Sequence, residues 1–142
     1  MRCLVTGGSG FLGSHVADKL TAKGYEVTIY DKKKSPWIKK KQKFVKGNLL
    51  DFKKLEKVVR KNKIIFHFAA FLGVDQVADN PLETMETETI GTFNIIQASI
   101  KNNVKKIIYA STSGVYGQVD IEHAVNENFR VSPSSEGPHE FE

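Results

Sequence analysis

The sequence predicts an α/β fold: a parallel sheet of about five strands, doubly wound so that helices cover both of its faces. Three observations support this prediction. Short apolar segments of strand length alternate along the 142-residue chain with segments of helical period. The apolar segments are rich in β-branched and aromatic residues, as strands buried on both faces are. A glycine-rich stretch also joins the first apolar segment to the first helical one.

The expected strands are short and occupy residues 2–6, 26–30, 43–47, 63–68 and 105–111. Right-handed crossovers between such strands imply a doubly wound sheet. The strand order 3-2-1-4-5 follows by analogy with other sheets of this kind. Cys3 lies inside the first strand and is the only cysteine. An intrachain disulfide is therefore excluded, and we expect Cys3 in the core of a protein from a reducing compartment.

The expected helices span residues 11–23, 51–62 and 82–101. Gly24 follows the first of them where a helix C-terminal glycine belongs. Asp51 is the expected N-cap of the second, and Pro81 is well placed at the start of the third. The residues at helical spacing are Phe11, Leu12, His15, Val16, Lys19 and Leu20 in the first helix, with Leu55, Val58 and Val59 as the inner face of the second.

Length and composition predict one globular domain that is 40% hydrophobic. Residues 1–117 carry the alternating pattern, whereas residues 118–142 are polar and add no further strand. We therefore expect a fold that is truncated at its C-terminal end, followed by an irregular tail. No segment reaches the length of a membrane span, and the N-terminus lacks a secretory leader pattern. These features predict a cytoplasmic protein without membrane contact.

The net charge of +5 is concentrated in one segment, whose lysines are Lys32, Lys33, Lys34, Lys39, Lys40, Lys41 and Lys43. A nucleic-acid surface is one interpretation, and it predicts an affinity that falls steeply with salt. We favour a solvated basic loop instead, because Trp37 is the only aromatic residue in the segment and no nucleic-acid module is recognisable.

The stretch TGGSGFLGSH at residues 6–15 places three glycines at intervals of three between a strand and a helix. Gly7 permits a tight turn out of the strand, Gly10 lets the backbone approach a pyrophosphate, and Gly13 lets the helix pack closely on the sheet. Phosphates bind readily at a helix N-terminus, where free amides and the helix dipole favour negative charge. The stretch therefore predicts a dinucleotide-binding site.

Asp31 ends the second expected strand, eighteen residues after Gly13. A carboxylate at this place accepts the hydroxyls of an adenosine ribose and repels a 2′-phosphate. The predicted cofactor is therefore NAD. Lys32 and Lys33 follow directly and could pair with a 2′-phosphate, so NADP stays as the less favoured alternative.

Five stretches together resemble a known family: TGGSGFLGSH at 6–15, GNLLD at 47–51, HFAA at 67–70, NPLETMETETIGTFNIIQA at 80–98 and YASTSGVYG at 109–117. They look like the extended short-chain dehydrogenase/reductases, specifically the NAD-dependent sugar-nucleotide epimerases and dehydratases. The resemblance runs from residue 2 to about residue 135. It implies a Rossmann-like fold, NAD as the cofactor, a nucleotide-sugar substrate and, as in many members, a homodimer packed through the helix over 82–101.

By this resemblance the cofactor contacts fall on the glycine stretch and on the ends of the second, third and fourth strands. The implied residues are Gly7, Gly10, Phe11, Leu12, Gly13, Asp31, Asn48, Leu49, Ala69 and Ala70. Asn48 stands where the family has an acidic residue, and its amide oxygen can still accept a hydrogen bond from the adenine. No metal site is implied. His67 precedes the two alanines, and we interpret it as a histidine packed at a strand end.

The catalytic residues of the family are only partly matched. Thr112 stands four residues before Tyr116, at the place of the serine or threonine that hydrogen-bonds the substrate hydroxyl. The family's Tyr-x-x-x-Lys pair, expected roughly two dozen residues later on one helix face, is absent from the matching stretch SPSSEGPHEFE. The only match, Tyr30 to Lys34, is interpreted as accidental. Glu88 occupies the place of an asparagine that steadies the catalytic helix.

The favoured hypothesis is the NAD-binding portion of a sugar-nucleotide epimerase or dehydratase, a family that transfers a hydride from a sugar hydroxyl to nicotinamide. Without the Tyr-x-x-x-Lys pair, we expect the chain to bind NAD and to be inactive alone. One alternative is a non-catalytic dinucleotide-binding module, whose exposed sheet edge would favour self-association. The less favoured alternative is a nucleic-acid-binding protein that uses the lysine-rich segment. The residues from Phe71 to Asn80 are expected to form a loop that faces the substrate.

Overall fold

The computed structural model describes residues 1–71 and 74–112 of the chain. The contacts divide the chain after Tyr109. The unit that ends at Tyr109 contains every helix and strand of the described residues, and residues 110–112 lie outside it. The domain boundary expected after residue 117 lies outside the described residues.

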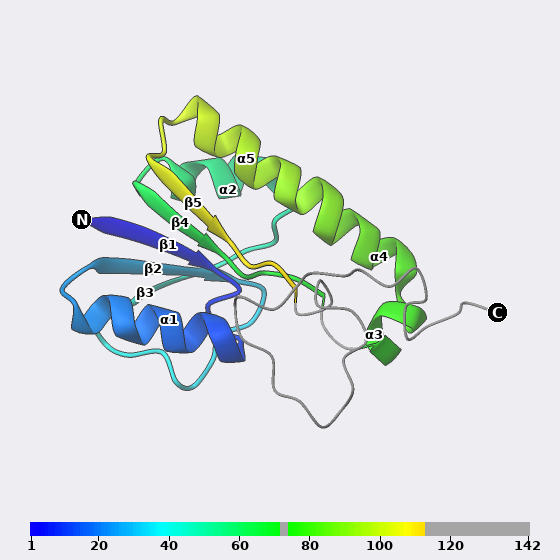
Figure 1. Ribbon diagram of the computed structural model, residues 1–142, viewed down its shortest axis with the longest axis horizontal. Coiled ribbons are helices and arrows are strands. Elements are labelled where there is room, and N and C mark those ends of the chain that lie inside the picture. Colours follow the sequence, from blue (N-terminus) through cyan, green and yellow to red (C-terminus); the bar gives the residue numbers. More distant parts are fainter. Residues whose placement is uncertain (72–73, 113–142) are drawn as a thin grey trace, which may run out of the picture. The chain divides into compact units, whose positions relative to one another are not determined.

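Five parallel strands form one sheet, as predicted (Figure 1). They are β1 (Arg2–Thr6), β2 (Glu26–Asp31), β3 (Lys43–Lys46), β4 (Ile64–His67) and β5 (Lys106–Tyr109). Their order is β3-β2-β1-β4-β5, which confirms the doubly wound topology. Thr6, the last residue of the central strand β1, is in register with Tyr30 on β2 and with His67 on β4. The carboxyl ends of these three strands therefore meet at one edge of the sheet.

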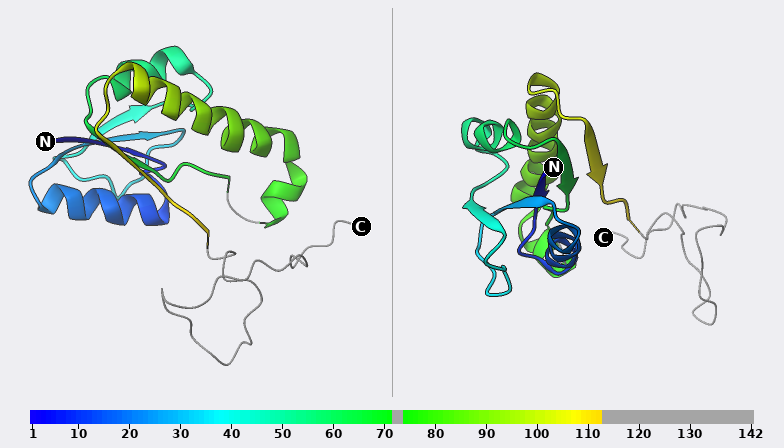
Figure 2. Two further views of the ribbon diagram at one scale, coloured as in Figure 1. Left: turned by 45° about the horizontal axis from the view of Figure 1, so that its top comes forward. Right: turned by 90° about the vertical axis from the view of Figure 1, so that its left-hand side faces the viewer.

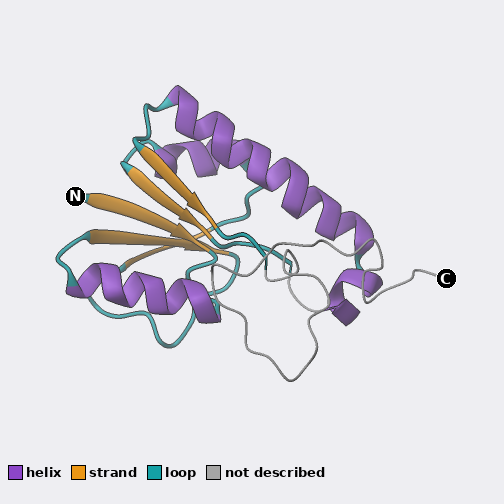
Figure 3. Cartoon of the chain, viewed as in Figure 1, coloured by secondary structure: helices purple, strands orange, loops and turns teal. Residues whose placement is uncertain are grey.

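Helices cover both faces of the sheet (Figures 2 and 3). On one face lies α1 (Phe11–Ala22), and on the other lie α2 (Phe52–Val59) and α5 (Thr92–Lys101). This arrangement is the one that right-handed crossovers between parallel strands produce.

Two hydrophobic clusters flank the sheet. Leu4 belongs to the cluster beneath α2 and α5, whereas its neighbour Val5 belongs to the cluster beneath α1, because successive side chains of a strand point to opposite faces. Cys3 is fully buried, as predicted, and burial raises the pKa of its thiol. The first cluster comprises Leu4, Tyr30, Leu49, Leu55, Val58, Val59, Ile65, Ile95 and Ala98, and the second Val5, Ala17, Val27 and Ile29.

The predicted helix boundaries are confirmed at three positions. Gly24 follows α1 with a φ of +81°, a left-handed conformation that glycine adopts readily. The Asp51 side chain accepts a hydrogen bond from the Lys54 N–H at 3.0 Å and so caps α2. Pro81 opens α4 (Pro81–Met85). The predicted inner face of α2 is buried at Leu55, Val58 and Val59.

Two parts of the chain between β4 and α5 differ from the prediction. The segment expected as a loop contains a short helix, α3 (Val74–Asp79). The expected single helix over 82–101 is interrupted between α4 and α5 by a π-helical turn, η1 (Glu86–Gly91). A π turn adds a residue within a continuous helix, and a pattern read at 3.6 residues per turn does not reveal it.

The buried face of α1 consists of Gly13 and Ala17. By contrast, Phe11 and Leu12, which are at helical spacing in the sequence, are 85% and 52% exposed. Small residues carry little hydrophobic signal, yet they allow the helix to lie close to the sheet. Of the large apolar residues at helical spacing, Leu20 packs against the cluster beneath α1, whereas Phe11 and Leu12 do not contribute to the buried face.

Large apolar side chains are exposed along α4, η1 and α5. They are Leu82, Met85, Ile90, Phe93, Ile96 and Ile100. On β5, Ile107 and Tyr109 are also exposed. Within the described part of the chain, no helix has both the length and the apolar character needed to cross a bilayer.

Candidate functional site

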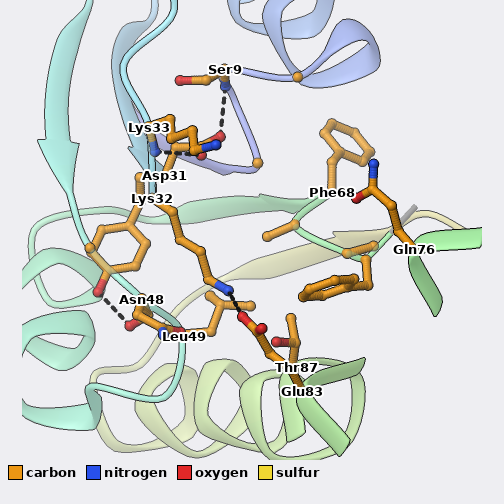
Figure 4. A pocket seen from close by; sticks show the side chains of 17 residues that line it. Ser9, Asp31, Lys32, Lys33, Asn48, Leu49, Phe68, Gln76, Glu83 and Thr87 are labelled. Carbon is orange, nitrogen blue, oxygen red and sulfur yellow. Dashed lines mark hydrogen bonds and ion pairs between the residues drawn. The ribbon is translucent and has the colours of Figure 1, made fainter. Parts of the chain in front are cut away.

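A cavity of about 670 Å³ lies at the carboxyl ends of the strands (Figure 4). Loops that follow β1, β3 and β4 line it together with the end of β2 and residues of α3, α4 and η1. Ligands of doubly wound sheets bind at this edge, where the strand order reverses. Seven of the ten predicted cofactor residues line the cavity: Gly7, Gly10, Asp31, Asn48, Leu49, Ala69 and Ala70.

The glycine turn after β1 is as tight as predicted. Gly7 has a φ of +66°, and a Cβ at this position would lie 2.6 Å from the backbone nitrogen of Ala69. The Gly10 N–H donates to the Gly7 carbonyl at 3.0 Å, which closes the turn. A Cβ at Gly13 would lie 2.2 Å from the same carbonyl oxygen. Only glycine therefore allows the loop, the helix and β4 to approach one another this closely.

The Asp31 carboxylate lies opposite this turn, at the end of β2. One of its oxygens accepts a hydrogen bond from the Ser9 N–H at 3.0 Å, and the other accepts from the Lys33 N–H at 3.2 Å. The two bonds fix the carboxylate at the wall of the cavity. Each oxygen retains a further lone pair, with which it can accept a hydrogen bond from a ligand hydroxyl.

Asn48 and Leu49 form the wall contributed by the loop after β3. The Asn48 amide oxygen accepts from the Leu50 N–H at 3.1 Å, and the Leu49 carbonyl accepts from the Asn94 side chain at 2.9 Å. A Cβ on Gly91 would lie 2.9 Å from the Cβ of Leu49, so glycine permits this close contact with η1. The loop is therefore held in place by the long helical segment that follows α4.

Ala69 and Ala70 form the opposite wall, directly after β4. The Ala69 N–H donates to the Thr6 hydroxyl at 3.4 Å, and the backbone at Ala69 packs against Gly7. A small side chain at this place leaves the cavity open beside the glycine turn.

His67 is 2% exposed and lies between two threonines. Its Nδ1 is 2.6 Å from the Thr6 hydroxyl, and its Nε2 is 3.2 Å from the Thr92 hydroxyl. Burial lowers the pKa of His67 to about 4, so the imidazole is neutral at neutral pH. Because Thr6 accepts from the Ala69 N–H, we assign its proton to the bond with Nδ1, which leaves the Nε2–H to donate to Thr92. His67 is a packed histidine, as predicted.

Two hydroxyl groups in the cavity wall were missed by the sequence reasoning. The side-chain oxygens of Ser9 and Thr87 are buried and have no hydrogen-bond partner among the described residues. Both residues line the cavity. Ser9 lies inside the glycine stretch, where it could have been singled out, whereas Thr87 enters the wall through the π turn η1, which left no sequence signal. Unpaired buried hydroxyls favour a polar ligand, because leaving them unsatisfied costs free energy.

An ion pair in the cavity wall was also missed. The Lys32 ammonium lies 2.9 Å from the Glu83 carboxylate, and its nitrogen is 5.4 Å from the centre of the Phe71 ring. All three residues line the cavity. The sequence showed Lys32 as a neighbour of Asp31 and as part of the lysine-rich segment, and nothing in it connects Lys32 with a residue on α4.

Glu88, on η1, contacts the segment after β4. Its carboxylate accepts a hydrogen bond from the Phe71 N–H at 2.6 Å, and Glu88 is half-buried. Glu88 therefore fastens η1 to Phe71, which lines the cavity.

Three predicted cofactor residues do not line this cavity. The side chains of Phe11 and Leu12 are exposed. Phe11 lines a neighbouring cavity of about 450 Å³, which shares Ser9 and Gly10 with the first. Gly13 is buried beneath the glycine turn. Thr112 belongs to the part of the chain beyond Tyr109 and is exposed. Of the expected substrate-facing segment, residues 72–73 lie outside the described residues.

Tyr30 has a structural role that accounts for its place beside the cavity. It is 1% exposed, and its hydroxyl donates to the Asn48 carbonyl at 2.9 Å. Burial, together with the nearby Asp51 carboxylate, raises the pKa of Tyr30 to about 12. A tyrosine that abstracts a proton near neutral pH needs a lowered pKa instead. The Tyr30 to Lys34 spacing is therefore not a catalytic pair.

The chain belongs to the NAD dependent epimerase/dehydratase family, whose sequence model matches residues 3–137. Among its relatives is a UDP-N-acetyl-alpha-D-glucosaminuronate decarboxylase of Bacillus cytotoxicus, which is 42% identical over 127 residues. That alignment covers 82% of this chain and 38% of the relative. A putative UDP-glucose 4-epimerase of Methanocaldococcus jannaschii is 36% identical over 137 residues, which cover 93% of this chain and 45% of the relative. The chain thus spans less than half the length of these relatives.

Solved structures show the same fold. The UDP-glucose 4-epimerase of Thermus thermophilus in complex with NAD matches with a TM-score of 0.80 and 32% identity, over 94% of this chain and 45% of that one. The UDP-glucose 4-epimerase of Thermotoga maritima with UDP-glucose matches with a TM-score of 0.78 and 35% identity, over 85% and 41% of the two chains.

Proposed function

We propose that the cavity binds NAD and that this chain is the cofactor-binding part of an enzyme that acts on nucleotide sugars. Its family is NAD-dependent, and its relatives are named for the epimerisation, dehydration or decarboxylation of UDP-linked or dTDP-linked sugars. The chain spans less than half the length of the first two of these relatives. We therefore propose, and do not infer from the relatives' names, that it serves a reaction on a nucleotide sugar.

The cavity has the features that a dinucleotide needs. The backbone at Gly10 is exposed, and a Cβ there would meet only the Gly7 carbonyl within 4 Å, so a phosphate can approach it. No side chain caps the N-terminus of α1, which leaves its first amides available to an anion. The unpaired hydroxyls of Ser9 and Thr87 add two groups that can pair with a polar ligand. The described residues therefore fit the cofactor.

The observation that carries the proposal is the position of Asp31 against the glycine turn. Its carboxylate is bonded to the Ser9 N–H and lines the same cavity as Gly7 and Gly10. A carboxylate so placed accepts hydrogen bonds from the adenosine ribose while the turn binds the pyrophosphate. Asn48 and Leu49 would contact the adenine, and Ala69 and Ala70 would line the remainder of the cofactor. The backbone amides of Phe11 and Leu12 would contact the pyrophosphate, with Gly13 allowing α1 to approach.

When bound, NAD supplies a nicotinamide ring that accepts a hydride from the carbon of a sugar hydroxyl. We propose that Thr112 positions that hydroxyl by a hydrogen bond. The sequence has no Tyr-x-x-x-Lys pair after Thr112. We therefore expect the 142-residue chain to bind NAD without turning over a nucleotide sugar.

Calorimetric titration of the 142-residue chain with NAD⁺ and NADP⁺ tests this proposal. Saturable binding of NAD⁺ is expected, with NADP⁺ weaker. Asp31→Ala should weaken NAD⁺ binding about tenfold, which corresponds to roughly 1.4 kcal/mol. Asp79→Ala is the matched control, since Asp79 is exposed on α3 and does not line the cavity. Absence of NAD⁺ binding, or an equal loss in both variants, would overturn the proposal.

A second candidate function is a non-catalytic dinucleotide-binding module that associates with a second copy of itself. The exposed apolar side chains along α4 and α5, including Phe93 and Ile100, favour it. Sedimentation velocity over a range of concentrations tests this candidate. We expect the sedimentation coefficient to rise with protein concentration. The double variant Phe93→Ser/Ile100→Ser should suppress this rise. A monomer at every concentration would exclude it.

A further inference from the structure

Lys32, directly after Asp31, is paired with an acid from a distant part of the chain. Its Nζ lies 2.9 Å from Oε1 of Glu83 on α4, which is 51 residues later in the sequence. Its ammonium also lies 5.4 Å from the centre of the Phe71 ring, within the range of a cation–π contact. Figure 4 shows the Lys32 side chain directed away from Asp31 and toward Glu83. The ammonium is therefore held on the α4 side of the cavity.

The charges at the cavity wall make this pairing significant for an anionic ligand. Asp31, Lys32, Lys33 and Glu83 are the charged side chains that line the cavity in the described part of the chain. Lys33 contacts Asp31 through its backbone N–H, and within the same residues no ion pair engages its ammonium. Glu83 is thus the group that neutralises Lys32.

We propose that Glu83 makes the site select NAD over NADP by occupying the ammonium of Lys32. This inference rests on the proposed function of the cavity as a dinucleotide site. A 2′-phosphate on the adenosine ribose would lie beside Asp31, whose carboxylate repels it. A lysine next to that carboxylate is a suitable partner for the phosphate. In this chain, however, the Lys32 ammonium must first break its ion pair with Glu83. Discrimination against NADP therefore depends on two acids, one on β2 and one on α4.

The variant Glu83→Gln tests the proposal, because it removes the charge and keeps the side-chain size. Glu83 is exposed, so the variant is expected to fold. Affinities for NAD⁺ and NADP⁺ are measured at low ionic strength, directly and by displacement of NAD⁺, since salt screens such pairs. We expect the ratio of NADP⁺ to NAD⁺ affinity to rise about threefold to fivefold, as suits a half-exposed ion pair.

Two controls make the result specific. Glu86→Gln removes an exposed charge one turn further along the same helical segment, from a residue that does not line the cavity, and should leave the ratio unchanged. The double variant Lys32→Ala/Glu83→Gln should show no rise above Lys32→Ala alone. An unchanged ratio in Glu83→Gln with NAD⁺ binding intact would overturn this inference, as would an equal rise in Glu86→Gln. If the unaltered chain does not bind NAD⁺, the proposed function is overturned instead.

Discussion

The hydroxyl of Thr6 lies 2.6 Å from Nδ1 of His67, and the two residues are in register at the ends of β1 and β4. The same hydroxyl accepts from the Ala69 N–H, so the contact continues into the wall of the cavity. A buried polar pair of this kind ties two strand ends together next to the glycine turn. Protonation of the His67 imidazole should therefore affect the stability of the fold.

We expect stability to fall as the pH is lowered toward the pKa of His67. Burial lowers that pKa from 6.5 to about 4, so below pH 6.5 the unfolded chain takes up a proton that the folded chain does not. The free energy of unfolding is therefore highest above about pH 6.5. Between about pH 6.5 and pH 4 it falls progressively by about 3 kcal/mol. Urea unfolding of the chain and of His67→Gln between about pH 4 and pH 8 measures it. Parallel pH profiles for the two proteins would contradict the prediction.

Gly7→Ala should destabilise the chain and abolish NAD⁺ binding. The left-handed conformation at Gly7 costs another residue about 1–3 kcal/mol, and the new Cβ would meet the backbone of Ala69 at 2.6 Å. Gly24→Ala is a matched control: φ there is +81°, but no atom lies within 4 Å of the added Cβ. The control should lose about 1–2 kcal/mol of stability and keep its NAD⁺ affinity. Unfolding and calorimetry together separate the two effects, and intact binding in Gly7→Ala would contradict the prediction.

Removing the Glu88 carboxylate should release the segment after β4. The Phe71 N–H donates to this carboxylate at 2.6 Å, and Glu88→Ala leaves it without that acceptor. A loss of about 1–2 kcal/mol in stability is expected, with faster amide exchange at Phe71. Glu88→Gln keeps an acceptor oxygen and should exchange nearly as slowly as the unaltered chain. Hydrogen-exchange NMR checks this, and equal exchange in all three proteins would mean that the bond does not restrain Phe71.

Asp51→Ala should weaken α2 by removing its cap. The Asp51 side chain accepts from the Lys54 N–H at 3.0 Å, and loss of such a cap costs about 1 kcal/mol. Asp51→Asn retains an acceptor, and its free energy of unfolding should stay within a few tenths of a kcal/mol of the original value. Denaturant unfolding at neutral pH compares the three. A loss as large in Asp51→Asn as in Asp51→Ala would show that the charge, and not the cap, is responsible.

Much of the fold could be predicted from local features of the chain. The alternation of strand-length apolar segments with helical segments predicted the sheet, and the strand order was predicted by analogy with other doubly wound sheets. Gly24, Asp51 and Pro81 predicted helix boundaries because each acts on its own backbone or on residues within one turn. The glycine spacing around Gly7 predicted the tight turn for the same reason.

The candidate site was predicted in part, at the residues that follow strands. Asp31 and Ala69 lie at the ends of strands, and the carboxyl ends of parallel strands meet at one edge, so topology alone places them together. The wall contributed by η1 was missed, because Thr87 reaches the cavity through a π turn that a 3.6-residue period does not reveal.

The sequence by itself therefore determined the fold class, the helix boundaries and the glycine turn with its carboxylate, all of which depend on short-range backbone preferences and on periodic burial. The tertiary structure decided which distant groups meet. Lys32 and Glu83 are 51 residues apart, Thr6 and His67 are 61 apart, and Phe71 and Glu88 are 17 apart. Contacts of this kind leave no periodic signal, because their partners become neighbours only when the sheet and its helices have packed.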